Sequence, residues 1–225
     1  MGKDKLRKFA ENKTFWNVVE PTREEVINNF SFKGKWRKEF FKNENPIILE
    51  LGCGKGEYSV GLGRYFPDKN FLGIDVKGAR FWKGAKTAIE YGMKNVGFLR
   101  TQIELVEYLF SPGEVEEIWI TFPDPQIKYK RAKHRLVHPD FFEKYKKIMN
   151  SEGSVHLKTD SEFLHGYANG LLQGLGYEVL ASHHDIYGAP EYELPSYVRE
   201  IKTYYEKMFL KERKPITYLN FKLHS

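Results

Sequence analysis

The first long apolar run of the chain contains an acidic residue near its end and is followed by three closely spaced glycines. The run PIILEL (46–51) contains Glu50 and is followed by Gly52, Gly54 and Gly56. Glycine lets the backbone turn sharply and approach a ligand closely. The spacing is G-x-G-x-G, which differs from the G-x-G-x-x-G of dinucleotide sites. The pattern therefore predicts a turn that binds a nucleoside rather than a dinucleotide.

The charges near this turn favour a cationic ligand. A dinucleotide places its pyrophosphate at the N-terminus of the next helix, where the Glu50 carboxylate would repel it. The same carboxylate suits the cationic methionyl part of S-adenosylmethionine. Asp75 ends the second run, FLGID (71–75), where an acid can accept hydrogen bonds from both ribose hydroxyls. We therefore expect S-adenosylmethionine as the cofactor, bound by Glu50, the three glycines and Asp75.

Two further acids follow later apolar runs and predict the chemistry of the acceptor. Asp124 lies between two prolines, which restrict the backbone around it, and Asp160 follows SVHLKT (154–159). Carboxylates accept hydrogen bonds from the N1–H and N2–H₂ groups of guanine. Guanine N7 carries a lone pair and needs no deprotonation before it attacks a sulfonium methyl group. Alignment would then carry catalysis, together with carboxylates near the positive charge that develops on the ring.

A basic run directly follows Asp124 and predicts contacts with RNA phosphates. Its members fall within eight residues: Lys128, Lys130, Arg131, Lys133 and Arg135. A second basic region covers residues 1–45, which we interpret as a basic N-terminal extension. The net charge of the whole chain is +6, which is consistent with a polyanionic partner.

Composition limits the other possibilities. The 225 residues include 41 % hydrophobic and 29 % charged residues, and no run approaches the ~20 apolar residues of a membrane span. The first residues lack the apolar core of a signal peptide. The single cysteine, Cys53, fits the reducing cytoplasm. The adjacent histidines His183 and His184 point in different directions on a strand or turn, so we expect no metal site.

Apolar runs alternate with helical patterns from residue 46 onward. The expected strands are 46–51, 71–75, 95–99, 117–122, 154–159, 177–182 and 216–223. The expected helices are 56–66, 78–91, 139–149, 161–174 and 196–211. This rhythm predicts an α/β fold: a Rossmann-like, seven-stranded, mostly parallel sheet with one antiparallel edge strand and helices on both faces. Ligands bind such sheets at the carboxyl ends of the strands. Residues 46–225 would form this catalytic domain.

At these residues the chain resembles the bacterial tRNA (guanine-N7-)-methyltransferase family, whose members are class I S-adenosylmethionine-dependent methyltransferases. The specific match is FPDP with the basic segment after it; the other matching stretches are LELGCGKG (49–56), GIDVKG (73–78), KHRLVHPDF (133–141), TD (159–160) and TYYE…PITYLNF (203–221). The resemblance implies methylation of the guanine at position 46 of the tRNA variable loop. It also implies a catalytic and cofactor-binding Asp124, and substrate contacts from Lys128, Asp160, Thr203 and Glu206.

The chain departs from the family pattern at three places. Gln102 stands where the family has a third cofactor acid, and its amide can still contact the adenine. Gln126-Ile127 replaces an aromatic residue and its small or histidine neighbour, and His134 replaces an arginine of the basic run.

Two alternative functions remain open at this point. One is a methyltransferase with another target, either another RNA or a small-molecule or protein nitrogen; an enzyme acting on a small molecule or a protein would not need the basic run. The other is a non-catalytic RNA-binding protein, which would have no physical reason to keep Glu50, Asp75 and Asp124. The sequence leaves the oligomeric state and the preferred tRNAs open.

Overall fold

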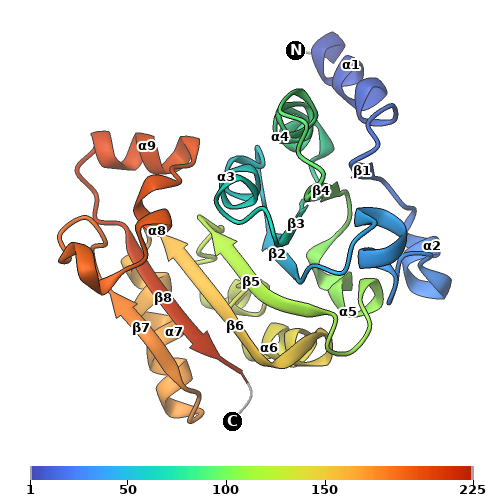
Figure 1. Cartoon of the computed structure of the whole chain (residues 1–225). Coiled ribbons are helices and arrows are strands. Elements are labelled where there is room, and N and C mark those ends of the chain that lie inside the picture. Colours follow the sequence, from blue (N-terminus) through green and yellow to red (C-terminus); the bar gives the residue numbers. More distant parts are fainter. Residues whose placement is uncertain (1, 224–225) are drawn as a thin grey trace.

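The chain forms one mixed sheet with helices on both faces in a computed structural model that describes residues 2–223 (Figure 1). The strands are β1 (Val18–Val19), β2 (Ile47–Leu51), β3 (Asn70–Ile74), β4 (Val96–Leu99), β5 (Val115–Thr121), β6 (Met149–Thr159), β7 (Val179–His183) and β8 (Thr217–Lys222). Their order is β1-β4-β3-β2-β5-β6-β8-β7. Only β8 is antiparallel to its neighbours, β6 and β7. The predicted α/β arrangement is therefore present.

The sheet differs from the expected one in strand number and in the place of its antiparallel strand. It has eight strands rather than seven, and β8 lies between β6 and β7 rather than at the edge. The extra strand, β1, pairs with β4 over only two residues, too few to show an alternating pattern in the sequence. The buried Asn17 beside it donates from its amide to the carbonyls of Ala85 and Val96, which fixes this strand by tertiary contacts.

The helices match four of the five expected ones in position, the fifth is divided in two, and three further helices, the first, second and fifth along the chain, were not expected. The helices are α1 (Gly2–Asn12), α2 (Arg23–Asn29), α3 (Glu57–Tyr65), α4 (Gly78–Glu90), α5 (Val106–Leu109), α6 (Pro139–Ile148), α7 (Glu162–Gly174), α8 (Ser196–Glu200) and α9 (Tyr204–Lys211). The helix expected over 196–211 is two helices, because Thr203 caps a new helix and accepts a hydrogen bond from the backbone of Glu206. Within residues 2–223, no helix is long and apolar enough to span a membrane.

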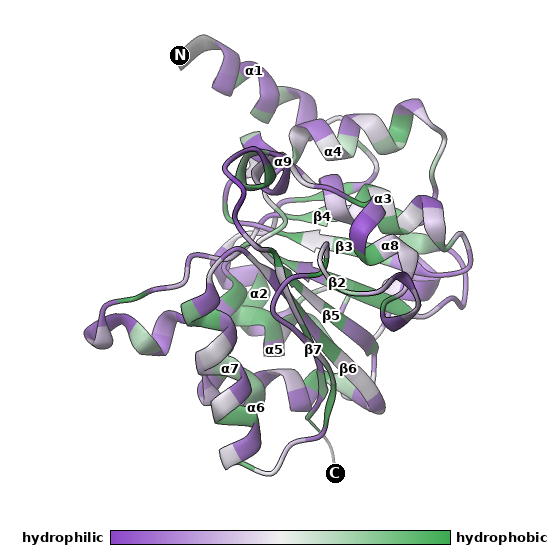
Figure 2. Ribbon diagram, turned by 90° about the vertical axis from the view of Figure 1, so that its left-hand side faces the viewer, coloured by the Kyte–Doolittle hydropathy of each residue, from purple (hydrophilic) through white to green (hydrophobic). Residues whose placement is uncertain are grey.

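The sheet buries an apolar cluster on each face. One cluster joins it to α2, α5, α6 and α7, and the other joins it to α3, α4 and α8. Figure 2 shows hydrophobic residues along the strands and hydrophilic ones on the outer sides of the helices. All five residues of β2 are buried, so Glu50, the residue before the last of this strand, is held in a low-dielectric interior.

The segment expected as a basic extension, residues 1–45, contributes to this sheet and core. The helix α1 lies beside α4 (Figure 1), where Asn12 donates to the carbonyl of Gly78. Trp36, Phe40 and Phe41 of the π-helical turn η1 (Trp36–Phe41) are buried against the sheet. The lysines and arginines of this segment therefore alternate with side chains that pack in the core.

Candidate active site

The turn from β2 to α3 has the backbone that its glycines predict. Gly52, Gly54 and Gly56 all have positive φ, at 76°, 56° and 72°, the left-handed region that other residues avoid. A β-carbon at Gly52 or Gly54 would meet no atom closer than 4.0 Å, whereas at Gly56 it would lie 2.4 Å from Phe98. The first two glycines leave room for a ligand. The third, predicted to bind cofactor, packs α3 against the sheet and α4.

Glu50 lies directly beneath this turn and is 2 % exposed. One carboxylate oxygen accepts from the Ser59 backbone at 2.8 Å and from its hydroxyl at 2.5 Å. The other accepts from the Thr121 hydroxyl at 2.7 Å. Burial raises the pKa of Glu50 to about 7, although these hydrogen bonds oppose the rise. A positive charge placed above the turn would favour the ionised form of the Glu50 carboxyl group.

A cavity of about 450 Å³ opens at the carboxyl ends of β2, β3 and β4. Gly52, Asp75, Gln102 and Asp124 are among its lining residues, so the structure brings together four of the predicted cofactor-binding positions. The two Asp75 oxygens accept from the backbone N–H groups of Gly54 and Lys77 at 3.0 and 2.8 Å. These bonds hold the carboxylate at the end of β3.

Gln102 is held by a residue far away in the sequence. Arg23, in the first turn of α2, donates to its Oε1 atom at 2.8 Å. The capping box formed by Thr22 and Glu25 fixes the start of α2, and hence the position of the guanidinium. With its oxygen occupied in this way, the Gln102 amide can offer N–H donors to the cavity. No pattern in the sequence indicated a role for Arg23.

Asp124 stands on the opposite side of the cavity, in a loop of unusual backbone geometry. Phe122 and Gln126, two residues before and after it, have φ of 48° and 47°. Non-glycine residues in this region are strained and concentrate at functional sites. Asp124 is exposed, and its Oδ1 atom accepts from the Gln126 backbone at 3.0 Å. The loop therefore presents a charged carboxylate to the cavity in one orientation.

Arg135 supports this loop and does not face the solvent. It is 5 % exposed, and its guanidinium donates to the carbonyls of Pro125, Gln126 and Ile127. The same group lies over the ring of Tyr167. The predicted RNA contact at Arg135 has no support in this structure, because its donors are used by the Asp124 loop.

The other cations of the basic run are free to meet a polyanion. The run continues from Lys128 into the short 3-10 helix η3 (Tyr129–His134), and its exposed cations are Lys128, Lys130, Arg131 and Lys133. Within the described part of the chain, these four side chains form no ion pair. They extend from the loop that carries Asp124.

The predicted substrate residues Asp160 and Thr203 lie at the ends of neighbouring elements. Ser161 caps α7, which leaves the Asp160 side chain outside the cap. Partial burial raises the pKa of Asp160. The Thr203 hydroxyl accepts from the Glu206 backbone at 3.1 Å as the cap of α9. Neither residue lines the 450 Å³ cavity, so their substrate contacts stay predictions.

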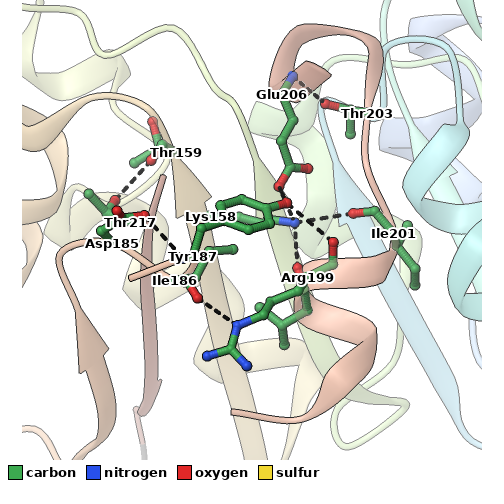
Figure 3. A network of polar contacts seen from close by, with 11 residues as sticks. Lys158, Thr159, Asp185, Ile186, Tyr187, Arg199, Ile201, Thr203, Glu206 and Thr217 are labelled. Carbon is green, nitrogen blue, oxygen red and sulfur yellow. Dashed lines mark hydrogen bonds and ion pairs between the residues drawn. The ribbon is translucent and has the colours of Figure 1, made fainter. Parts of the chain in front are cut away.

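Glu206 forms a buried ion pair with a lysine that the sequence interpretation did not single out. Its Oε1 atom lies 2.7 Å from Nζ of Lys158, and both side chains are 0 % exposed. Lys158 also donates to the carbonyls of Val198 and Ile201, and Tyr187 donates to Glu206 (Figure 3). Burial lowers the pKa of Lys158 to about 8, against the opposing effect of Glu206.

This pair ties the end of β6 to the segment between α8 and α9. It holds the carbonyls that the break between the two helices leaves without helical partners. The sequence does contain a signal for this ion pair, which is the lysine within the apolar strand SVHLKT. A lysine buried in such a strand requires a partner of opposite charge.

Comparison with known proteins identifies the family. A family model described as a putative methyltransferase matches residues 44–219. A tRNA (guanine-N(7)-)-methyltransferase of Christiangramia forsetii is 62 % identical over 98 % of both chains. The chain belongs to the tRNA (guanine-N(7)-)-methyltransferase family. A family member from Bacteroides fragilis is 50 % identical over 99 % of this chain and 87 % of its own length.

Solved structures share the methyltransferase fold with this family member. A structure titled an antibiotic related methyltransferase has a TM-score of 0.61 at 15 % identity, covering 94 % of this chain and 98 % of its own. The 16S rRNA methyltransferase KamB has a TM-score of 0.59 at 14 % identity, covering 80 % and 89 %. At these identities the likeness concerns the fold alone.

The cavity of this family member fits a cationic nucleoside. Gly52 and Gly54 leave room at the turn, Asp75 offers acceptors, and the buried Glu50 beneath the turn would add negative charge when ionised. Among residues 2–223, no three His, Cys, Asp or Glu side chains form a cluster that could hold a metal ion.

Proposed function

We propose that this protein transfers a methyl group from S-adenosylmethionine to N7 of guanine 46 in the variable loop of tRNA. The observation that carries the proposal is one cavity lined by both Asp75 and Asp124, in a chain 62 % identical over 98 % of its length to a tRNA (guanine-N(7)-)-methyltransferase. The family resemblance supplies position 46. A tRNA substrate and a single free thiol, Cys53, are both consistent with a cytoplasmic location.

The chain's own residues would hold the cofactor at the glycine turn. S-adenosylmethionine supplies an electrophilic methyl group on a sulfonium. Asp75 would accept hydrogen bonds from the ribose hydroxyls, and Gln102, oriented by Arg23, would meet the adenine. Gly52 and Gly54 would let the backbone approach the methionyl part, whose positive charge Glu50 would stabilise.

The guanine would enter from the side of the Asp124 loop after leaving its stack. Asp124 would orient the base and stabilise the positive charge that develops on the ring as N7 attacks. Because N7 has no proton to lose, no general base is required. Lys128, Lys130, Arg131 and Lys133 would neutralise phosphates of the same tRNA.

The proposal is tested by mapping the methyl group. With labelled cofactor, we expect transfer to an unmodified tRNA transcript, and mass spectrometry of its nuclease fragments should locate N7-methylguanine at position 46. A transcript with adenine at position 46 is the matched control and should accept no label. Label in bulk protein or small amines, or at another nucleotide, would contradict the proposal.

Cofactor affinity should depend on pH through Glu50. Its folded-state pKa of about 7 lies above the ordinary 4.5, so the folded protein keeps a proton on this residue between these values. Stability from this group is therefore lost as the pH rises through that window. A cationic cofactor lowers the pKa and should release a proton on binding near pH 7, and its affinity should fall in acid.

Calorimetry in two buffers of different ionisation enthalpy measures this proton release. The Glu50→Gln variant should bind the cofactor more weakly and without release in this pH range. Equal proton release by the wild type and the variant would show that Glu50 is not coupled to the cofactor.

A further inference from the structure

A second cavity, of about 200 Å³, lies between α3, α4 and the segment that leads into α9. Of the predicted site residues, only Gly56 lines it. Five cationic side chains line it from three separate parts of the chain: Lys55, Arg64, Lys83, Lys202 and Lys207. We call these five residues the α3–α9 cationic surface. They face a single lining carboxylate, Glu57.

These cations lack acidic partners in the described part of the chain. None of the five lies within the 4.0 Å ion-pair distance of a carboxylate, unlike Lys69, which is held by Glu116 and Glu117. Glu57 accepts from the Tyr204 backbone at 2.7 Å and thus anchors the start of α9. Five positive side chains without carboxylate partners among the described residues line one cavity, and a polyanion would relieve their mutual repulsion.

Exposed aromatic rings stand among the charges. Tyr204 and Tyr205 are 50 % and 40 % exposed, with ring centroids 5.6 Å apart. Nζ of Lys55 lies 3.5 Å from the Tyr204 ring centroid. Proteins bind RNA strands with this combination, in which cations follow the backbone and aromatic rings stack on bases. The cations come from three separate parts of the chain rather than from one fork of donors, which suits an extended phosphate backbone.

The cationic surface borders the candidate active site. The glycine turn separates the two cavities, since Gly52 lines the larger and Gly56 the smaller. The helices α3 and α4 cover one face of the sheet, and α6, which follows the basic run, covers the other. Figure 1 shows α9 by the carboxyl end of β6, whereas α3 and α4 lie over β2, β3 and β4. Cations therefore flank the proposed guanine pocket from both faces.

We propose that the α3–α9 cationic surface binds phosphates of the same tRNA whose guanine enters the Asp124 pocket. The polynucleotide then crosses the carboxyl edge of the sheet, with the basic run on one side and this second surface on the other. This inference rests on the proposed function. It assigns RNA binding to residues outside the FPDP loop.

The test neutralises two cations that lie outside the catalytic and cofactor machinery. In the Lys83→Gln/Lys207→Gln variant, tRNA affinity measured by filter binding should fall at low salt. The slope of log affinity against log salt should flatten by about 0.7–0.9 for each lost contact. Cofactor affinity and the unfolding temperature should stay unchanged, because both lysines are exposed.

Two further variants separate this inference from the proposed function. Lys38→Gln/Lys42→Gln removes two exposed lysines that precede β2 at the other end of the strands, and it should leave the slope unchanged. Lys130→Gln/Arg131→Gln/Lys133→Gln should also flatten the slope, and its effect should add to that of the Lys83 and Lys207 changes.

The outcomes distinguish the two proposals. If Lys83→Gln/Lys207→Gln keeps the wild-type slope while methyl transfer to guanine 46 is normal, the second surface is wrong and the proposed function stands. An equal flattening of the salt slope in the Lys38→Gln/Lys42→Gln control would also overturn the second surface, since the loss of net charge alone would explain the effect. Competition by a mononucleotide phosphate as strong as that by tRNA would assign the surface to a small ligand instead.

Discussion

Replacing Asp124 with Asn is expected to lower the turnover of methyl transfer by about 10²–10³-fold, the usual cost of removing one preorganised electrostatic contact. The substitution keeps the size of the side chain and its turn with Gln126, but it removes the charge. The amide also presents a donor to the donors of guanine, and the ring loses its partner as positive charge develops. Single-turnover rates with labelled cofactor and unmodified tRNA measure the effect.

Measurements of tRNA binding distinguish this loss of turnover from a general folding or binding defect. The affinity of Asp124→Asn for tRNA should change little, because phosphate contacts dominate it. The Asp140→Asn variant is the matched control, since Asp140 is exposed at the start of α6 and does not line the cavity. It should keep the wild-type rate. Near-normal transfer by Asp124→Asn would leave Asp124 as a turn residue and make Asp160 the leading candidate.

Replacing Lys158 with Met is expected to destabilise the protein by about 3–5 kcal/mol, because it leaves the Glu206 carboxylate buried without its countercharge. It also removes the donor from the carbonyls of Val198 and Ile201. For a chain of this size the unfolding temperature should fall on the order of 10 °C. Thermal or denaturant unfolding measures the change.

The double variant Lys158→Met/Glu206→Met tests the cause. With both charges removed, it should recover much of the lost stability, because a buried pair can be replaced by apolar side chains of similar volume. Lys146→Met is the control: it breaks an exposed pair with Glu143 and should cost under about 1 kcal/mol. A double variant no more stable than Lys158→Met would assign the loss to packing rather than to the unpaired charge.

The sequence alone was sufficient where function rests on local patterns. The apolar run of β2, the glycines after it and the acid that ends the next strand lie close together in the chain, and short-range rules describe them. The alternation of strands and helices then brings the ends of β2, β3 and β5 to one edge. For this reason Asp75 and Asp124 could be expected in one site, and the structure lines one cavity with both.

Tertiary structure alone decided the roles that depend on distant contacts. Arg135 belongs to the basic run in the sequence, yet its guanidinium donates hydrogen bonds to the carbonyls of the Asp124 loop. Glu206 pairs with Lys158 across 48 residues of sequence, and Arg23 reaches Gln102 from α2. Burial and partnership arise only when elements pack, and a charged side chain looks the same in the sequence whether it will meet solvent, RNA or a countercharge in the core.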